Sequence, residues 1–366
     1  MTPCTACLRR AQLVGTLSLQ IAGRLTGRHR TAPILALSDR DLIEAVGGSF
    51  AAAARRTLRE FDRDAYLARL TEAGLHGVCR HEDAYPEQLL ALVDPPALLH
   101  STAPTDALAD LCRPPSVAVV GTRRASAYGI EVATALGRGL ARAGVTVVSG
   151  LALGIDAAAH RGALEGGGRT VAVLGCGADV AYPRANRTLY ERIRASGAVI
   201  AELPPAQRPA RWTFPARNRI MAGIAGATVV VEAAERSGSL ITVGFAQDLG
   251  REVCAVPGRV TSRIAAGANQ LLLDGAHPVR GVADVLDVVF GVGRWDARSV
   301  APAEATEALD PRLRVVLSTV ETGDSLDEAA DRSGLSAAEL RAALGRLELL
   351  GLIRRDGLGA YERRAA

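Results

Sequence analysis

Apolar and polar residues follow two different patterns along the chain, and the pattern changes near residue 117. From there to about residue 258, short and nearly uninterrupted apolar runs alternate with stretches in which apolar residues recur at helical spacing. The apolar runs cover residues 117–120, 146–148, 170–174, 198–200, 228–231 and 253–256. Helices are predicted near residues 128–143, from residue 156, and near residues 187–195, 217–225 and 240–249. Strands without a polar face that alternate with helices indicate an α/β fold, with a parallel sheet covered by helices on both sides.

The first part of the chain, to about residue 110, is predicted to form short helices. Ser38 precedes a plausible helix start, and residues 51–73 form a second helical stretch after a Gly-Gly turn. Two helices around such a turn resemble a small helical module of the helix-hairpin-helix or SAM-like kind, which often contacts the DNA backbone. Residues 1–116 carry 13 arginines and 13 acidic residues, so packing or protein contact is the first expectation here.

The last part of the chain, residues 311–366, is predicted to form a separate unit after a linker at residues 291–310. Ser336 and Glu339 form a capping box before a leucine-rich helix. Two short runs then flank Asp356-Gly357, as the strands of a hairpin flank its turn. Helix, turn, helix and hairpin make a winged-helix pattern. Because the region is acidic overall, DNA binding and protein contact both stay open as its role.

The overall composition is that of a soluble globular protein, with 48% hydrophobic and 22% charged residues. Apolar runs fall short of the roughly 20 residues that a membrane helix needs. Arg9 and Arg10 interrupt the N-terminus, where a signal peptide would need an apolar stretch. We therefore expect a cytoplasmic protein without a membrane partner.

Arginine supplies all 43 basic residues, and a GC-rich genome is the plainest cause. Residues 117–285 carry 19 arginines and 12 acidic residues, whereas the rest of the chain is neutral or acidic. Between Arg184 and Arg219 there are eight arginines and two acidic residues. A planar guanidinium suits phosphate and also stacks on bases, so this middle region is the candidate for anion binding. A solvated surface is the alternative for some of these side chains.

Small and polar residues follow several strands of the predicted sheet. These segments are residues 121–126, 149–156, 175–177 and 237–239. Because the carboxyl ends of parallel strands meet at one sheet edge, the segments are expected to form a phosphate-binding rim. For any single loop, a tight turn explains the glycines equally well. The candidate binding residues on these loops are Gly121, Arg123, Ser149, Gly150, Gly154, Ser237, Gly238 and Ser239, and those between residues 184 and 219 are Arg184, Asn186, Phe214, Arg217, Asn218 and Arg219.

Catalytic and cofactor motifs are weak in this sequence. Without lysine there is no phosphate-binding G-x-x-x-x-G-K-[ST] motif, and no G-x-G-x-x-G follows the first strand of the sheet. Asp156 is expected to be a helix N-cap, and His160 a packing or hydrogen-bonding residue. We therefore expect no catalytic residue and no cofactor.

Six cysteines are expected to be free thiols. Cys4 and Cys7 have the spacing of metal ligands, but no second Cys or His pair follows at the usual distance of a zinc site. We therefore expect no metal there.

The central region resembles the bacterial DNA-processing protein family DprA, also called Smf. The segments that carry the resemblance are residues 120–123, 149–160, 182–186, 214–220, 237–242 and 256–258, and residues 85–96 are similar to the family's lead-in segment. The match covers about 200 residues, and these segments are highly specific when taken together. The predicted organisation is an N-terminal helical module at 1–110, an extended Rossmann-like domain at 111–290, the linker, and a winged-helix domain at 311–366.

The resemblance implies a protein that binds single-stranded DNA without strong sequence preference and has no catalytic turnover. It also implies protection of incoming strands in natural transformation, loading of the RecA recombinase, and a homodimer formed through the Rossmann-like domain. By position, Arg123, Arg184, Arg217 and Arg219 would be the phosphate-binding cations.

Two other functions stay open. Related Rossmann-like enzymes hydrolyse nucleoside monophosphates with a PGGxGTxxE loop, but residues 237–242 lack the catalytic glutamate at that spacing. A pure adaptor would bind other proteins through its terminal domains and would have no DNA affinity in the central domain.

Overall fold

The structure is a computed structural model, and it describes residues 2–24, 33–295, 309–350, 352–355 and 360–363. The chain divides into two compact units, Met1–Asp296 and Ala297–Ala366. Most of the predicted linker and the Asp356-Gly357 turn lie outside the described residues. The finer domain boundaries expected from the sequence stay a prediction.

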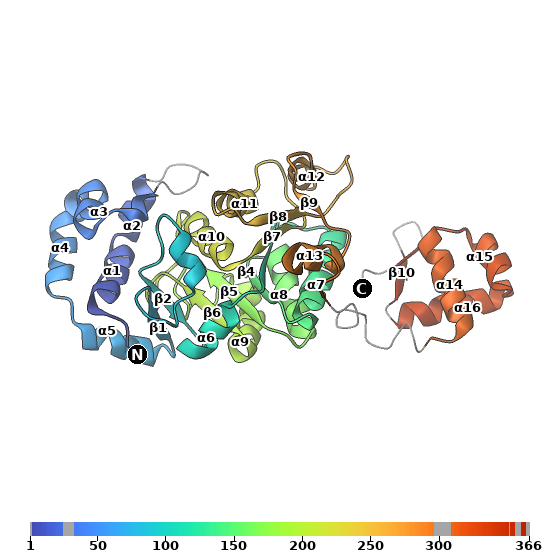
Figure 1. The fold of residues 1–366 in the computed structure, drawn as a ribbon, viewed down its shortest axis with the longest axis horizontal. Helices are drawn as coiled ribbons and strands as arrows, with labels where there is room; N and C mark the ends of the chain where they lie inside the picture. Colours follow the sequence, from blue (N-terminus) through green and yellow to red (C-terminus); the bar gives the residue numbers. More distant parts are fainter. Residues whose placement is uncertain (1, 25–32, 296–308, 351, 356–359, 364–366) are drawn as a thin grey trace. The chain divides into compact units, whose positions relative to one another are not determined.

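In the larger unit, the described residues include a nine-stranded sheet with the order β1-β2-β6-β5-β4-β3-β7-β8-β9 (Figure 1). Its six central strands are parallel, and they are β3 (Ser116–Val120), β4 (Thr146–Ser149), β5 (Thr170–Leu174), β6 (Ala198–Ala201), β7 (Ala227–Val230) and β8 (Glu252–Ala255). Nearly every residue in these strands is buried, which explains why their sequences lack a polar face. The predicted α/β fold is confirmed.

Three further strands extend the sheet at its edges. They are β1 (His76–Cys79), β2 (Leu98–Ser101) and β9 (His277–Pro278). Helices were expected through residue 110, and this expectation was wrong for β1 and β2, which pair antiparallel with each other. The apolar signal of β2 is broken by buried polar residues: His100 shares hydrogen bonds with Tyr66 at 2.9 Å and with the Ala201 carbonyl at 3.2 Å. Buried polar side chains with hydrogen-bond partners lower the hydropathy of a strand although the strand is buried, so the sequence pattern does not reveal it.

Helices cover both faces of the sheet. Those after β2 are α6 (Thr105–Cys112), α7 (Ala127–Arg142), α8 (Ile155–Glu165), α9 (Arg187–Ser196), α10 (Thr213–Ile224), α11 (Ser239–Asp248), α12 (Ala266–Leu273) and α13 (Val282–Phe290). One core joins α6, α10, α11 and α12 to Val171, Val173 and Ile200, whereas a second joins α8 and α9 to Ala172 and Val199. Alternating residues of β5 and β6 thus face opposite helix layers, as the pleat of a strand requires.

Five helices precede the sheet: α1 (Thr5–Thr16), α2 (Ser18–Arg24), α3 (Asp39–Val46), α4 (Ala51–Arg59) and α5 (Arg63–Glu72). Ser38 caps α3 as predicted, by accepting a hydrogen bond from the backbone N–H of Asp41. The stretch predicted as one helix at 51–73 is two helices, because Asp62 caps a new start at α5. The indole of Trp212 donates to the Ser18 carbonyl at 2.8 Å, so these helices pack against the start of α10.

The smaller unit contains α14 (Pro311–Thr322), α15 (Leu326–Ser333), α16 (Ala337–Leu349), β10 (Ile353–Arg355) and β11 (Tyr361–Arg363). The two strands pair antiparallel, and the predicted capping box at Ser336 and Glu339 is present. A compact apolar core joins its three helices to β10.

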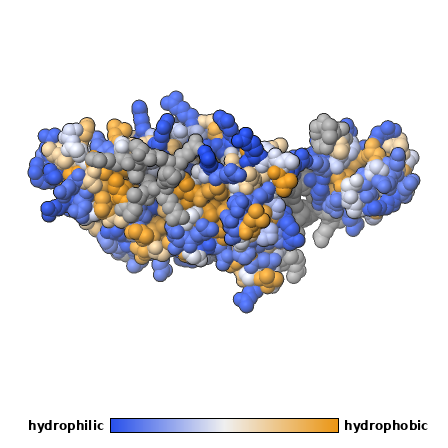
Figure 2. Space-filling view, turned by 90° about the horizontal axis from the view of Figure 1, so that it is seen from above, coloured by the Kyte–Doolittle hydropathy of each residue, from blue (hydrophilic) through white to orange (hydrophobic). Residues whose placement is uncertain are grey.

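In the described part of the chain, no helix combines the length and apolarity needed to cross a membrane. On the face shown in Figure 2, apolar patches are interrupted by hydrophilic side chains.

Candidate nucleic-acid groove

A groove of about 1140 Å³ lies at the carboxyl ends of β3 and β7. Residues 120–124, from the last residue of β3 onward, form one wall, and residues 236–239, which lead into α11, form another. Helix α10 supplies Phe214, Pro215, Arg217, Asn218 and Met221; its place beside the sheet is seen in Figure 1. The lining is completed by Ala22, Ala152, Asp156, Arg211, Trp212, Ile241 and Thr242. Ligands of open α/β sheets bind at this edge, so the fold and the groove point to the same place.

The groove is strongly basic. Among the described residues that line it, five are arginines and one, Asp156, is acidic. Four of these arginines are exposed and form no ion pair with a described residue: Arg123, Arg124, Arg211 and Arg236. Of the four, only Arg123 was among the predicted binding residues. Arg236 lies beyond the arginine-rich stretch, and only the fold brings it to the groove.

An arginine and two aromatic rings form a platform at the edge of the groove. The Arg123 guanidinium lies 5.1 Å from the centre of the Phe214 ring, within the range of a cation–π contact. The Tyr182 ring is 5.7 Å from the Phe214 ring and is 38% exposed. Sequence reasoning chose Phe214 but not Tyr182. Arg184, two residues after Tyr182, is exposed but is not among the residues that line the groove.

Arg217 lies at the base of the groove and is only 6% exposed. It donates a hydrogen bond to the Val173 carbonyl at 2.9 Å, and its other terminal nitrogen is 3.9 Å from an Asp156 oxygen. Burial lowers the pKa of Arg217, and Asp156 counteracts this shift. A Cβ atom at Gly150 would lie 1.4 Å from an Arg217 nitrogen. Gly150 therefore makes room for the guanidinium rather than for a ligand.

Asp156 organises the loop between β4 and α8. Its carboxylate accepts backbone hydrogen bonds from Gly150 at 3.2 Å and Ala152 at 3.3 Å, while burial raises its pKa and Arg217 opposes the rise. The expected N-cap role was wrong, because Gly154 is the cap and Asp156 lies in the first turn. Gly154 has a φ of 79°, and a Cβ there would lie 2.3 Å from the Thr122 carbonyl oxygen, so this position requires glycine.

Arg219 does not line the groove, and its expected role as a phosphate-binding cation was wrong. Its side chain is 1% exposed, and its Nε lies 3.0 Å from Asp94 while a terminal nitrogen lies 2.8 Å from Glu202. These carboxylates raise its pKa against the effect of burial. Two residues correspond to about 200° around a helix, so Arg217 and Arg219 face different sides of α10.

Ser149 and Asn186 also support the loops instead of lining the groove. The Ser149 hydroxyl is buried and donates to the Val119 carbonyl at 2.7 Å, and the Asn186 amide donates to the Leu151 carbonyl at 2.9 Å. The other predicted residues that line the groove, besides those above, are Gly121, Asn218, Ser237, Gly238 and Ser239.

Two helix N-termini differ in what they offer an anion. At the start of α7, the Glu232 carboxylate accepts hydrogen bonds from the Ser126 backbone N–H at 2.9 Å and from its hydroxyl at 2.5 Å. At the start of α11, the N-cap Gly238 provides no side-chain cap. The protein's own carboxylate thus fills the first site, while the second faces the groove. Glu232 was not among the residues singled out from the sequence.

Fold and groove together define an α/β protein with an arginine-rich groove at the carboxyl edge of its parallel sheet. Residues 76–290 match the family model for DNA recombination-mediator protein A, and residues 299–357 match the DprA winged helix domain. The chain therefore belongs to the DprA/Smf family.

A DNA processing protein DprA of Mycobacterium tuberculosis is 45% identical over 251 residues, which are 68% of this chain and 64% of the relative. The chain thus spans somewhat less than two thirds of that relative's length. Protein Smf of Synechocystis is 35% identical over 310 residues, which are 76% of this chain and 78% of the relative.

Two solved structures have the same fold. The X-ray structure of DprA from Streptococcus pneumoniae is 33% identical, has a TM-score of 0.62, and is matched over 78% of this chain and 98% of that one. DprA from Helicobacter pylori is 28% identical, has a TM-score of 0.53, and is matched over 58% and 94% of the two chains. The latter structure describes the single-stranded DNA binding mode of the Helicobacter protein.

Proposed function

We propose that this chain binds single-stranded DNA in the groove, without strong sequence preference, as part of DNA processing in transformation. The observation that carries the proposal is the set of four exposed arginines around the groove that form no ion pair with a described residue. Their charge is free to displace the counterions of a phosphate backbone, which is the main source of affinity for nucleic acid.

The platform supports a single strand over a duplex. Tyr182 is exposed beside Phe214 and Arg123, and only unpaired bases are free to stack on such an aromatic ring or on a guanidinium. Asn218 is only 8% exposed and its amide already donates to the Gly238 carbonyl at 3.2 Å, so it has little access to base edges. Binding led by phosphate contacts and stacking is tolerant of sequence.

The alternative function, an enzyme that acts on free nucleotides, is less well supported. Glu232 occupies the start of α7, where a mononucleotide phosphate would bind in many Rossmann-like folds. His160 is buried, and burial lowers its pKa to about 3, so it stays uncharged at neutral pH and has no path to a ligand in the groove. Asp156 is taken up by its own loop and by Arg217. We therefore propose a protein without catalytic turnover.

The finer parts of the proposal follow from family membership. We infer that the chain forms a homodimer through the Rossmann-like domain, acts in the cytoplasm, and loads the RecA recombinase onto the bound strand. Sedimentation of the full chain tests the dimer. Strand exchange by RecA on DNA coated with single-strand-binding protein, with and without this chain, tests the loading.

Fluorescence anisotropy tests the central proposal. Labelled mixed-sequence oligonucleotides of about 30 nucleotides are titrated with the full chain, in single- and double-stranded form. We expect tighter binding of the single strand, weakened steeply by salt. Equal affinity for the duplex, or no binding, would overturn the proposal. Release of free base from a nucleoside monophosphate would favour the enzyme instead.

A further inference from the structure

Three cysteines and a histidine from distant parts of the sequence meet at the join between α1 and β1. Cys4 is the N-cap of α1 and Cys7 lies in its first turn, whereas Cys79 ends β1 and His81 follows in the next turn. From the sequence, Cys4 and Cys7 are predicted to be two unpaired thiols, because no second Cys or His pair follows at zinc-site spacing. The second pair was missed because 74 residues separate Cys7 from His81, and only the fold brings them together.

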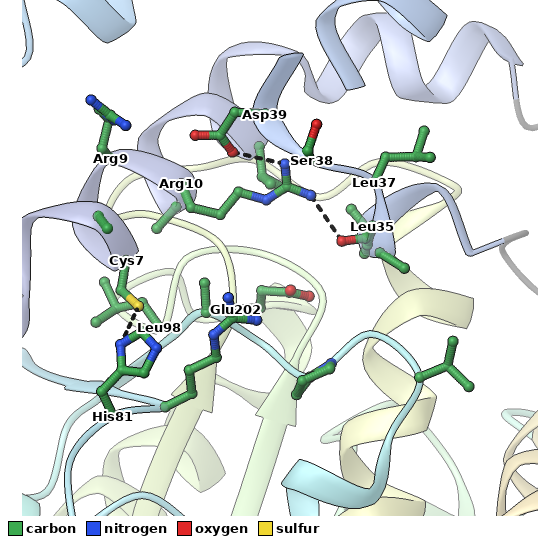
Figure 3. A pocket seen from close by; sticks show the side chains of 18 residues that line it. Cys7, Arg9, Arg10, Leu35, Leu37, Ser38, Asp39, His81, Leu98 and Glu202 are labelled. Atoms are coloured by element: carbon green, nitrogen blue, oxygen red, sulfur yellow. Dashed lines mark hydrogen bonds and ion pairs between the residues drawn. The ribbon is translucent and has the colours of Figure 1, made fainter. Parts of the chain in front are cut away.

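The four side chains have the dimensions of a tetrahedral metal site. Their ligand atoms all lie within 4.8 Å of one another, and Nδ1 of His81 is 3.4 Å from the Cys4 sulfur and 3.5 Å from the Cys7 sulfur. Zinc bonds of about 2.3 Å to sulfur and about 2.0 Å to nitrogen give tetrahedral edges of about 3.5 Å between S and N. Figure 3 shows the Cys7 sulfur directed at the His81 ring.

We propose that Cys4, Cys7, Cys79 and His81 bind one structural zinc ion. Four protein ligands complete a tetrahedron and leave no open position, which is typical of structural sites. Sulfur and imidazole select zinc over magnesium or calcium, which prefer oxygen. On binding, three thiols each lose a proton to solvent, and three Zn–S bonds and one Zn–N bond form. The resulting centre carries one negative charge, and Arg80 lies close enough to act electrostatically on Cys7.

The site would fasten the N-terminal helices to the edge of the sheet. Cys7 and Cys79 are buried and share a core with Leu8 of α1 and Leu98 of β2. Cys4 is half-buried and His81 is exposed, so an ion can enter from solvent. This role is independent of DNA binding, because none of the four ligands lines the groove.

Metal analysis of the full chain tests the proposal. The protein is purified without chelator or affinity tag, and zinc is measured by mass spectrometry alongside the absorption spectrum of the cobalt-exchanged form. We expect about one zinc per chain, and cobalt bands typical of tetrahedral thiolate coordination. His81→Ala and Cys4→Ser alter the more accessible ligands, so folding should survive, and they should lower retained zinc at least tenfold after dialysis against a weak chelator.

His76→Ala is the matched control, because His76 is exposed on the same strand and outside the cluster. Cys254→Ala is the second control, since it removes a buried thiol elsewhere in the sheet. Both should keep the metal. The proposal is overturned if the wild-type chain holds no zinc and takes up no cobalt, if His81→Ala and Cys4→Ser retain the metal as well as the controls do, or if mass spectrometry finds a disulfide among the three cysteines in freshly purified protein.

Discussion

Replacing Arg123 by alanine should weaken single-strand binding and flatten its salt dependence. Arg123 is exposed, forms no ion pair with a described residue, and lies over the Phe214 ring at the edge of the groove. Truncation removes one cation and leaves the core untouched, so the fold should be unaffected. A lost charged contact of this kind costs about 1.4 kcal/mol, which is about tenfold in affinity.

The slope of log affinity against log salt is a second measurable quantity, separate from the affinity at one salt concentration. Each phosphate neutralised on a single strand contributes about −0.7 to the slope of log affinity against log salt. Four exposed groove arginines thus predict a slope of about −2.8, and the loss of Arg123 reduces it to about −2.1. Raising salt from about 50 to about 200 mM should weaken wild-type binding about 50-fold and the variant's binding about 18-fold.

Anisotropy titrations at several salt concentrations measure both quantities. Arg142→Ala is the matched control, because Arg142 is exposed in the last turn of α7, about 24 Å along the helix from the groove end. It should bind as the wild type does. An Arg123→Ala slope equal to the wild-type slope would refute the assignment of Arg123 to the phosphate contacts. Arg217→Glu is a poorer test, since it places a carboxylate in a buried position beside Asp156.

Three further predictions concern stability. Arg219→Met should lower the free energy of unfolding by about 3–5 kcal/mol in urea titrations, because it leaves two carboxylates at a buried site without their cation. Gly150→Ala should cost about 1–3 kcal/mol, or more, because the new methyl group displaces the Arg217 guanidinium. His160, whose pKa falls to about 3 in the folded protein from about 6.5 when unfolded, binds a proton only in the unfolded chain between these values, so stability falls as pH drops below about 6.5. Between about pH 7.5 and pH 5 the wild type should lose about 2 kcal/mol more than His160→Asn, measured by urea unfolding at each pH.

Each of these predictions has a comparison that separates it from general damage. Arg138→Met breaks a more exposed ion pair with Glu165 and should cost less than about 1 kcal/mol. Gly238→Ala adds a methyl group in open space beside the groove, so stability should stay within about 0.5 kcal/mol. Equal losses in the paired variants would contradict the packing argument. A His160→Asn variant with the wild-type dependence on pH would show that this histidine is not buried in its neutral form.

The parallel sheet could be predicted because strands that are buried on both faces consist of nearly uninterrupted apolar residues. The strand at 170–174 has the predicted bounds, and the central helices differ by only a few residues. The edge strands β1 and β2 have a weaker apolar pattern. β2 carries a buried histidine that is hydrogen-bonded to Tyr66 and a buried serine that is hydrogen-bonded to the Ala103 carbonyl just beyond the strand. A hydropathy scale treats such residues as exposed.

The position of the groove at the sheet edge was predicted from the sequence, but only some of the residues that line it were. Charge and spacing indicate which arginines are near the sheet edge, but not on which side of a helix their partners lie. Arg219 was chosen because it is two residues from Arg217, and the carboxylates that bind it come from segments 125 and 17 residues away. Arg236 was missed for the opposite reason, since it is isolated in the sequence and near the other arginines only in space.

The hydrogen bond between Trp212 and Ser18 spans 194 residues, and this has a consequence for synthesis of the chain. At about 5–20 residues per second, the ribosome delivers Trp212 roughly 10–40 s after the second helix has emerged. During that interval the cluster of Leu13, Leu17 and Ile21 lacks the part of its apolar cover that Leu203, Trp212 and Ala216 provide. The core of the N-terminal helices is therefore completed only once the start of α10 has been translated, and until then these helices expose apolar surface that is prone to aggregation.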